Sequence, residues 1–146
     1  MPPQADPALE EARRIYQSAP FIRNIGARVV EAAPGRIVAE LALSEHLTQH
    51  HGFLHAGAAA TLADHTAGAA ATTLLRAGQA VLTVEFKINI LRPGRAPHYR
   101  CEAVVLKAGR RISVVESTIW ACEGEGRELQ SKASVTLAVV EAGATG

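Results

Sequence analysis

The amino-acid sequence predicts an α+β domain in which a curved antiparallel sheet of about six strands wraps around one central helix. One segment, residues 57–75, is rich in alanine and glycine almost all the way round, as a tightly enclosed helix would be. The segments on either side are β-rich, and some alternate between apolar and polar residues as half-buried strands do. The chain has 146 residues, of which 48% are hydrophobic, so it has enough apolar material for one sizeable core.

The elements follow one another in the order β-β-α-β-β-β-β. Asp6 and Pro7 can begin a short helix, because Asp caps well and Pro is tolerated at the first helical position, and Pro20 ends it. The polar, histidine-rich segment 44–55 is expected to be a loop. Glycine-bearing turns separate the predicted strands, which lie at residues 27–33, 36–43, 82–90, 98–107, 111–122 and 128–140.

The strand at residues 82–90 alternates strictly, which predicts one apolar and one polar face. The two sets are Leu82, Val84, Phe86, Ile88 and Ile90 against Thr83, Glu85, Lys87 and Asn89.

The expected organisation is an N-terminal helix or arm (1–20), a single domain (21–141) and a short flexible tail (142–146). Lysine and arginine total 15 against 14 acidic residues, which argues against nucleic acid or an anionic membrane as a bulk partner. No secretory signal is recognisable at the N-terminus, and no apolar stretch is long enough to span a membrane. Cys101 and Cys122 have no metal-site spacing, so we expect reduced core thiols and a cytoplasmic protein.

Asp64 is the most informative residue, because it interrupts the apolar helix and a buried carboxylate is costly unless it is paired or has a task. It shares a helical stripe with Gly57, Thr61 and Gly68. A structural salt bridge or cap is the simpler alternative. Gly57 lies at the start of the helix, where the first backbone amides lack intrahelical partners and favour a developing negative charge. Helix capping alone also explains a glycine at this position.

Four histidines, His46, His50, His51 and His55, lie within ten residues, and two pairs have the i, i+4 spacing of zinc ligands on a helix. Gly52 and the polar loop character argue against a helix there. We therefore expect no metal at this cluster.

Three segments resemble the hotdog-fold acyl-CoA thioesterases of the phenylacetic-acid-degradation (PaaI-like) group. Residues 49–64, QHHGFLHAGAAATLAD, resemble the family signature N/Q-x-x-G-x-x-H-G-G-x-x-x-x-L-x-D at the helix entrance. Residues 83–93 resemble the strand after the helix, and residues 107–111 resemble the loop that often approaches the nucleotide end of coenzyme A. Together with the order of elements, the resemblance covers roughly residues 25–140.

The resemblance implies an acyl-CoA thioesterase that needs no cofactor. It makes Asp64 the carboxylate base or nucleophile and the Gly57 amide the group that polarises the thioester carbonyl. Gln49 would orient substrate or water, Thr83 would contact the attacking water, and His55 matches the family histidine. It also implies a homodimer or homotetramer with active sites between subunits.

Ala56 departs from the family pattern, because the usual residue there is glycine. Its methyl group lies beside the expected thioester pocket and bears on the acyl preference.

The phosphates of coenzyme A need cationic or N–H partners at the pocket mouth. Charged residues in loops at strand ends are the candidates, with solvated loop charges as the simpler alternative. Together with Asn89, the predicted coenzyme A-binding set is Arg92, Arg95, Lys107, Arg110 and Arg111.

Two other functions remain open from the sequence. One is a hotdog hydratase or dehydratase acting on acyl thioesters, for which His65 beside Asp64 is of interest, although adjacent helix positions point about 100° apart. The other is a non-catalytic acyl-CoA-binding protein, which should lack the carboxylate.

Overall fold

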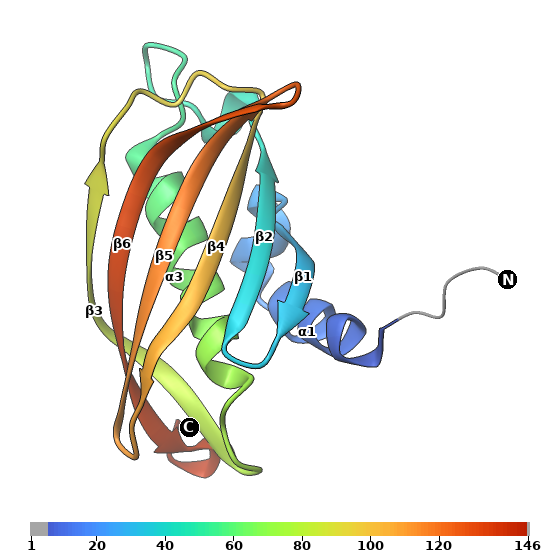
Figure 1. Cartoon of the computed structure of the whole chain (residues 1–146), viewed down its shortest axis with the longest axis vertical. Helices are drawn as coiled ribbons and strands as arrows, with labels where there is room; N and C mark the ends of the chain where they lie inside the picture. The colour runs from blue at the N-terminus through green and yellow to red at the C-terminus, as the bar shows by residue number, and fades with distance from the viewer. Residues whose placement is uncertain (1–5, 146) are drawn as a thin grey trace, which may run out of the picture.

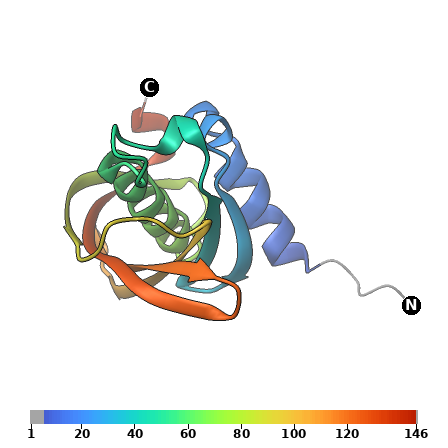
Figure 2. The same ribbon diagram turned by 90° about the horizontal axis from the view of Figure 1, so that it is seen from above.

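Six strands form one antiparallel sheet in the order β1-β2-β4-β5-β6-β3, and the sheet curves around helix α3 (Figures 1 and 2). The computed structural model describes residues 6–145. The strands are β1 (Arg28–Ala33), β2 (Arg36–Ala42), β3 (Gln79–Ile90), β4 (His98–Ala108), β5 (Ile112–Glu123) and β6 (Gly126–Glu141). The helices are α1 (Pro7–Gln17), α2 (Pro20–Ile25) and α3 (Ala56–Thr72), with short 3-10 turns η1 (Glu45–Leu47) and η2 (Ala142–Thr145). This architecture is the hotdog fold, as predicted.

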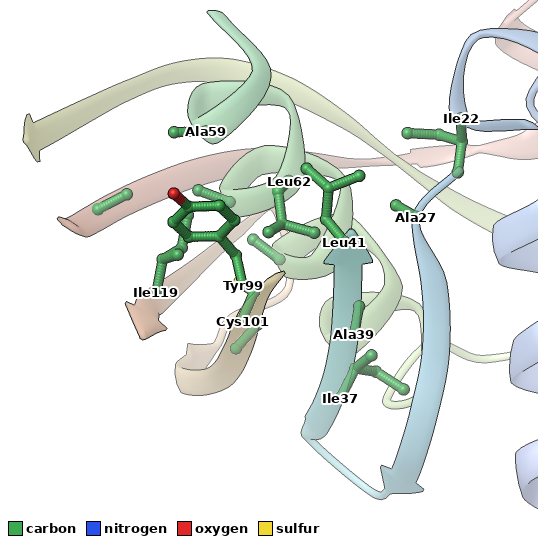
Figure 3. Packing of buried hydrophobic residues seen from close by; sticks show 14 of the residues in the cluster. Ile22, Ala27, Ile37, Ala39, Leu41, Ala59, Leu62, Tyr99, Cys101 and Ile119 are labelled. Atoms are coloured by element: carbon green, nitrogen blue, oxygen red, sulfur yellow. The ribbon is translucent and has the colours of Figure 1, made fainter. Parts of the chain in front are cut away.

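Helix α3 is buried because its small side chains let the strands approach closely. Leu62, Ala63 and Ala67 are fully buried. Figure 3 shows Leu62 between Leu41 of β2 and Tyr99 of β4, with Ile119 of β5 on the other side of Tyr99. The helix ends before the predicted residue 75, because the amides of residues 73–75 bond three residues back, which tightens the chain into a turn.

The N-terminal segment is part of the same core. The predicted helix is α1, but the sequence analysis missed α2, because Pro20 both ends one helical pattern and occupies the first turn of the next helix. Tyr16 and Ile22 are only 1% and 2% exposed, and the Tyr16 hydroxyl lies 3.1 Å from Thr66 Oγ1 of α3. The predicted division at residue 20 therefore does not separate two parts of the structure.

Strand β3 does not keep the predicted alternation of faces. Its pairing with β6 shifts between Thr83 and Glu85, which leaves Val84 as an extra residue in a bulge. Thr83 is opposite the buried Leu137, and Phe86 is opposite the buried Val135. Thr83 and Phe86 thus share the face toward α3, and the prediction that they lie on opposite faces is wrong.

Both cysteines are free and buried, as predicted. Burial raises the pKa of the Cys101 thiol to about 12 and also raises that of Cys122. The predicted flexible tail begins with η2 and is tied back by the Ala142 amide, which donates to the Gly78 carbonyl at 2.7 Å. None of the helices between residues 6 and 145 is both long and apolar enough to cross a membrane.

Candidate active site

Asp64 lies in the middle of α3, where β3 passes over the helix. The side chain is half-buried, and the Thr83 hydroxyl donates to its Oδ1 at 2.8 Å. This contact exists because the bulge at Val84 turns Thr83 toward the helix. The carboxylate is thereby held in one direction, as general-base or nucleophilic chemistry requires.

A hollow of about 360 Å³ opens in front of the carboxylate. Most of its lining is apolar, and two phenylalanines, Phe21 and Phe86, stand in it with 61% and 42% of their surface exposed. The lining residues are Ala19, Phe21, Ile22, Gly57, Ala60, Thr61, Asp64, His65 and Phe86. Such a surface suits an apolar acyl group beside a reactive carboxylate.

The helix entrance is built around His55. The Gly57 amide, predicted to polarise a carbonyl, donates instead to His55 Nδ1 at 2.8 Å, so the imidazole caps the helix. A Cβ on residue 57 would lie 3.0 Å from that nitrogen, which explains the glycine sterically. A substrate carbonyl must displace the imidazole before it can receive this hydrogen bond.

Gln49 borders a second hollow, of about 400 Å³, on the other side of the helix entrance. Its Oε1 accepts hydrogen bonds from the His51 and Phe53 amides, the second at 3.4 Å. Because the loop backbone occupies the oxygen, the side-chain NH₂ is the group positioned to donate to a ligand. Ala56 and the segment Ile90–Gly94 also line this hollow.

Within one chain Asp64 and Gly57 line the same hollow, but Asp64, Gly57 and Gln49 do not converge on one point. Asp64 and Gly57 are seven residues apart, or about 10 Å along the helix axis. Gln49 and Asp64 line different hollows. One carbonyl group cannot touch all three of these groups in a single chain.

The predicted cationic residues fall into two clusters at opposite ends of the sheet. Arg92 and Arg95 follow β3 at the end where α3 begins, whereas Lys107, Arg110 and Arg111 lie at the β4–β5 turn, at the other end (Figure 1). The 12 residues of β5 separate the two ends by about 40 Å.

Two further residues complete the comparison with the sequence prediction. Asn89 pairs with Lys132 on β6, on the face of β3 away from α3, so it does not approach Asp64. Sequence analysis missed Arg127, which lies at the start of β6 beside Arg92 and Arg95 in one hollow. The sequence did contain a signal for Arg127, because this residue directly follows the Gly124–Gly126 turn, which lies at the same end of the sheet as Arg92 and Arg95.

The four clustered histidines point to different partners. His46 Nε2 lies 3.3 Å from the Asn24 carbonyl oxygen, the His50 and His51 ring centroids are 4.1 Å apart, and His55 caps α3. Within residues 6–145, no group of three or more His, Cys, Asp or Glu side chains is placed to hold a metal ion.

His65 lines the same hollow as Asp64 but is anchored elsewhere. Its Nε2 lies 3.1 Å from the Tyr16 carbonyl oxygen, and its ring packs edge-on against the Tyr16 ring at 4.4 Å. Burial lowers the pKa of His65, so the imidazole is neutral at pH 7. A neutral ring donates Nε2–H to that carbonyl and supports α1.

The sequence of this chain is similar to those of known hydrolases. A model of the thioesterase superfamily matches residues 51–127, more than half of the chain and a span that includes Gly57, Asp64 and Thr83. A Saccharolobus solfataricus protein named as an esterase is 36% identical over 110 residues, 75% of this chain and 76% of that protein. A Listeria monocytogenes 1,4-dihydroxy-2-naphthoyl-CoA hydrolase is 28% identical over 95 residues, 65% of this chain and 77% of that protein.

Solved structures show the same similarity. The crystal structure of a thioesterase family protein from Silicibacter pomeroyi superposes with a TM-score of 0.86 at 34% identity, covering 90% of this chain and 97% of that chain.

Proposed function

The chain belongs to the thioesterase superfamily and is a thioester hydrolase, and on that basis we propose that it hydrolyses acyl-CoA thioesters with Asp64 as the catalytic carboxylate. The observation that carries the proposal is the Asp64 side chain, held by Thr83 at 2.8 Å at the edge of an apolar hollow. No serine or cysteine nucleophile is needed. Water supplies the oxygen, the carbon–sulfur bond breaks, and the products are the free acid and coenzyme A.

The carboxylate acts either as general base on water or as nucleophile toward the carbonyl carbon. Both routes develop negative charge on the carbonyl oxygen, which needs donors. The Gln49 NH₂ is one of those donors, and the Gly57 amide is a second once His55 turns aside, whereas the Ala58 and Ala59 amides already donate to the His55 carbonyl.

A second copy of the chain completes the site. Strand β3 is an edge strand of the sheet, and Leu82 and Val84 on it are 51% and 62% exposed. Pairing of β3 with its copy about a two-fold axis would cover this edge. With the two-fold axis perpendicular to β3, the two α3 helices would run antiparallel, and the Gly57 end of one α3 would face the Asp64 region of the other. The functional unit is therefore a homodimer, with a homotetramer built from it as the larger form.

Coenzyme A is the proposed thiol carrier, in line with the name of the Listeria relative. Its phosphates are anionic, and both arginine-containing clusters at the ends of the sheet are candidates to bind them. The two buried free thiols fit a reducing cytoplasm, where we place the protein.

Release of free thiol from a panel of aryl- and aliphatic acyl-CoA esters tests the proposal. Asp64→Asn and Asp64→Ala should lose at least about a hundredfold in kcat, because no other described carboxylate lines the hollow. Circular dichroism and gel filtration should be unchanged, since Asp64 forms no ion pair among residues 6–145 and its removal leaves no buried cation without a partner. Turnover close to that of the wild type in either variant would remove Asp64 from the mechanism.

A further inference from the structure

We propose that the acyl group of the substrate is an aliphatic chain of medium length, whose distal half lies in a groove between α1 and α3. This inference rests on the proposed function, because the chain would begin at a thioester carbonyl beside Asp64. The distal half of the groove is a hollow of about 300 Å³, called here the distal hollow. Alanines, which leave room beside the two helices, make up half of its lining: Ala8, Ala12, Ala32, Ala33 and Ala69.

The distal hollow and the hollow at Asp64 follow one another along the same two helices. On α3, His65 lines the hollow at Asp64, and Ala69, one helical turn later, lines the distal hollow. On the facing segment the order is reversed, because Ile15 lines the distal hollow and Ala19, four residues later, lines the hollow at Asp64. The two segments thus run in opposite directions past both hollows. An alkyl chain that leaves Asp64 between them reaches the distal hollow.

The lining of the distal hollow favours an apolar ligand, because each of its polar side chains already has a partner. The hydroxyls of Thr72 and Thr73 donate to carbonyls of α3 at 2.8 and 2.7 Å. Glu11 forms an ion pair with Arg14 at 2.7 Å. Among the described residues that line the hollow, these three are the only ones with polar side chains. A charged ligand would therefore lose its hydration without gaining a counter-charge.

The passage between the two hollows is also apolar. Ile15 is 38% exposed, although its helix packs on the core, and an alkyl chain in the groove would cover this surface. His65 lies opposite, with its Nε2 engaged at 3.1 Å by the Tyr16 carbonyl oxygen. Burial lowers the pKa of His65, so the ring is uncharged at pH 7.

The length of the groove sets the size of the acyl group. The β1–β2 turn closes its far end, because Pro34 lines the distal hollow and the Gly35 amide donates to the Thr73 hydroxyl at 2.7 Å. Asp64 and Thr72 are eight residues apart, or about 12 Å along the helix axis. An extended chain advances about 1.2 Å per bond, so about ten carbons fill this distance.

The proposed dimer leaves the distal hollow open. Strands β1 and β3 are the two edges of the sheet. Helix α1 lies along β1 (Figures 1 and 2), where the Arg13 side chain donates to the Val29 carbonyl at 3.1 Å. Pairing through β3 takes place at the other edge, so the partner subunit would not fill the space between α1 and α3.

Steady-state kinetics with a series of saturated straight-chain acyl-CoA esters test the proposal. For the wild type, kcat/KM should rise about two- to fourfold with each added methylene up to about ten carbons and then stop rising. Ala69→Leu fills the distal hollow from α3, and Ala12→Leu fills it from α1. Each should lower kcat/KM for the decanoyl ester about tenfold, the contribution of about two buried methylenes, and for the butyryl ester by less than about twofold.

Ala42→Leu is the matched control, because it makes the same change at an exposed position of β2 outside both hollows. It should leave the chain-length profile unchanged. Thermal unfolding shows whether each variant is folded, and the two filling variants lie on different helices, so one of them suffices for the test.

Direct binding separates the failure of this proposal from failure of the proposed function. The probe is 1-decanol, which carries the alkyl chain without coenzyme A and without charge. Calorimetry should show about tenfold weaker binding of 1-decanol to Ala69→Leu and Ala12→Leu than to the wild type or Ala42→Leu. If the wild type hydrolysed no acyl-CoA ester but bound 1-decanol in this pattern, the proposed function would fail and the groove would stand. If acyl-CoA esters were hydrolysed with the same chain-length profile in the wild type and in both filling variants, the groove would be overturned and the proposed function kept.

Discussion

Gly94 is a position where the structure predicts a large effect from one added methyl group. A Cβ on Gly94 would lie 2.6 Å from Leu54 Cβ, 2.8 Å from the Tyr99 hydroxyl oxygen and 3.3 Å from the Leu54 nitrogen. None of these atoms can move alone, because Tyr99 is fully buried and the Leu54 amide donates to the Gly94 carbonyl at 2.8 Å. Gly94→Ala must push the two segments apart.

The expected loss in free energy of unfolding is about 1–3 kcal/mol, the usual cost of overpacking a well-packed site. For a chain of this length that corresponds to a fall in Tm of about 3–10 °C. Because Leu54 precedes His55, the same displacement should disturb the α3 entrance, so kcat should fall as well. Thermal unfolding followed by circular dichroism measures the first effect, at one fixed concentration because the Tm of an oligomer depends on it.

Gly68→Ala is the matched control. Its Cβ would meet Leu137 Cδ2 at 3.8 Å, an ordinary contact, inside a helix that alanine favours. This variant should gain about 0.5–1 kcal/mol. A Gly94→Ala protein with wild-type stability, or one no less stable than Gly68→Ala, would refute the steric reasoning.

Three further predictions follow from the site and its surroundings. Mixing Asp64→Asn with Gln49→Ala protomers should restore about a quarter of wild-type activity. Half of the dimers formed by subunit exchange are mixed, and each mixed dimer has one intact composite site out of two. If each site were contained in a single chain, subunit exchange would give no gain in activity. Because the folded-state pKa of His65 is lowered, the unfolded chain binds the extra proton, so the free energy of unfolding should fall as pH drops below about 6.5. Urea titrations at pH 7.5 and 5.5 should show a smaller fall in His65→Gln, and an unchanged fall would exclude His65 as the cause. Burial raises the pKa of Cys101 to about 12, so native protein at pH 8 should react negligibly with a thiol reagent. Denatured protein should titrate 2 thiols. Fast labelling of the native protein would contradict the buried position.

Local sequence determined most of the fold. The alanine-rich run specified a helix that can only be enclosed, and the turn residues specified where one strand ends and the next begins along the chain. Asp64 stood out because a carboxylate inside such a helix is costly without a task. These features depend on near neighbours along the chain, so the sequence exposes them directly.

Tertiary structure decided how the site residues meet. Alternation placed Thr83 on the face opposite Phe86, but the bulge at Val84 turns Thr83 toward Asp64, because pairing with β6 sets the register. Helix α2 was missed for a similar reason, since its formation depends on burying Ile22 against the core.

The charged residues show the same limit. Arg92 and Arg110 look equivalent in sequence, as loop cations at strand ends, yet the sheet places them at opposite ends of α3. Arg127, far from Arg92 along the chain, shares a hollow with it because the turns after β3 and β5 meet at one end of the sheet. Composition and periodicity carry no information about such pairs, because they record which residues the chain contains and not which distant strands become neighbours.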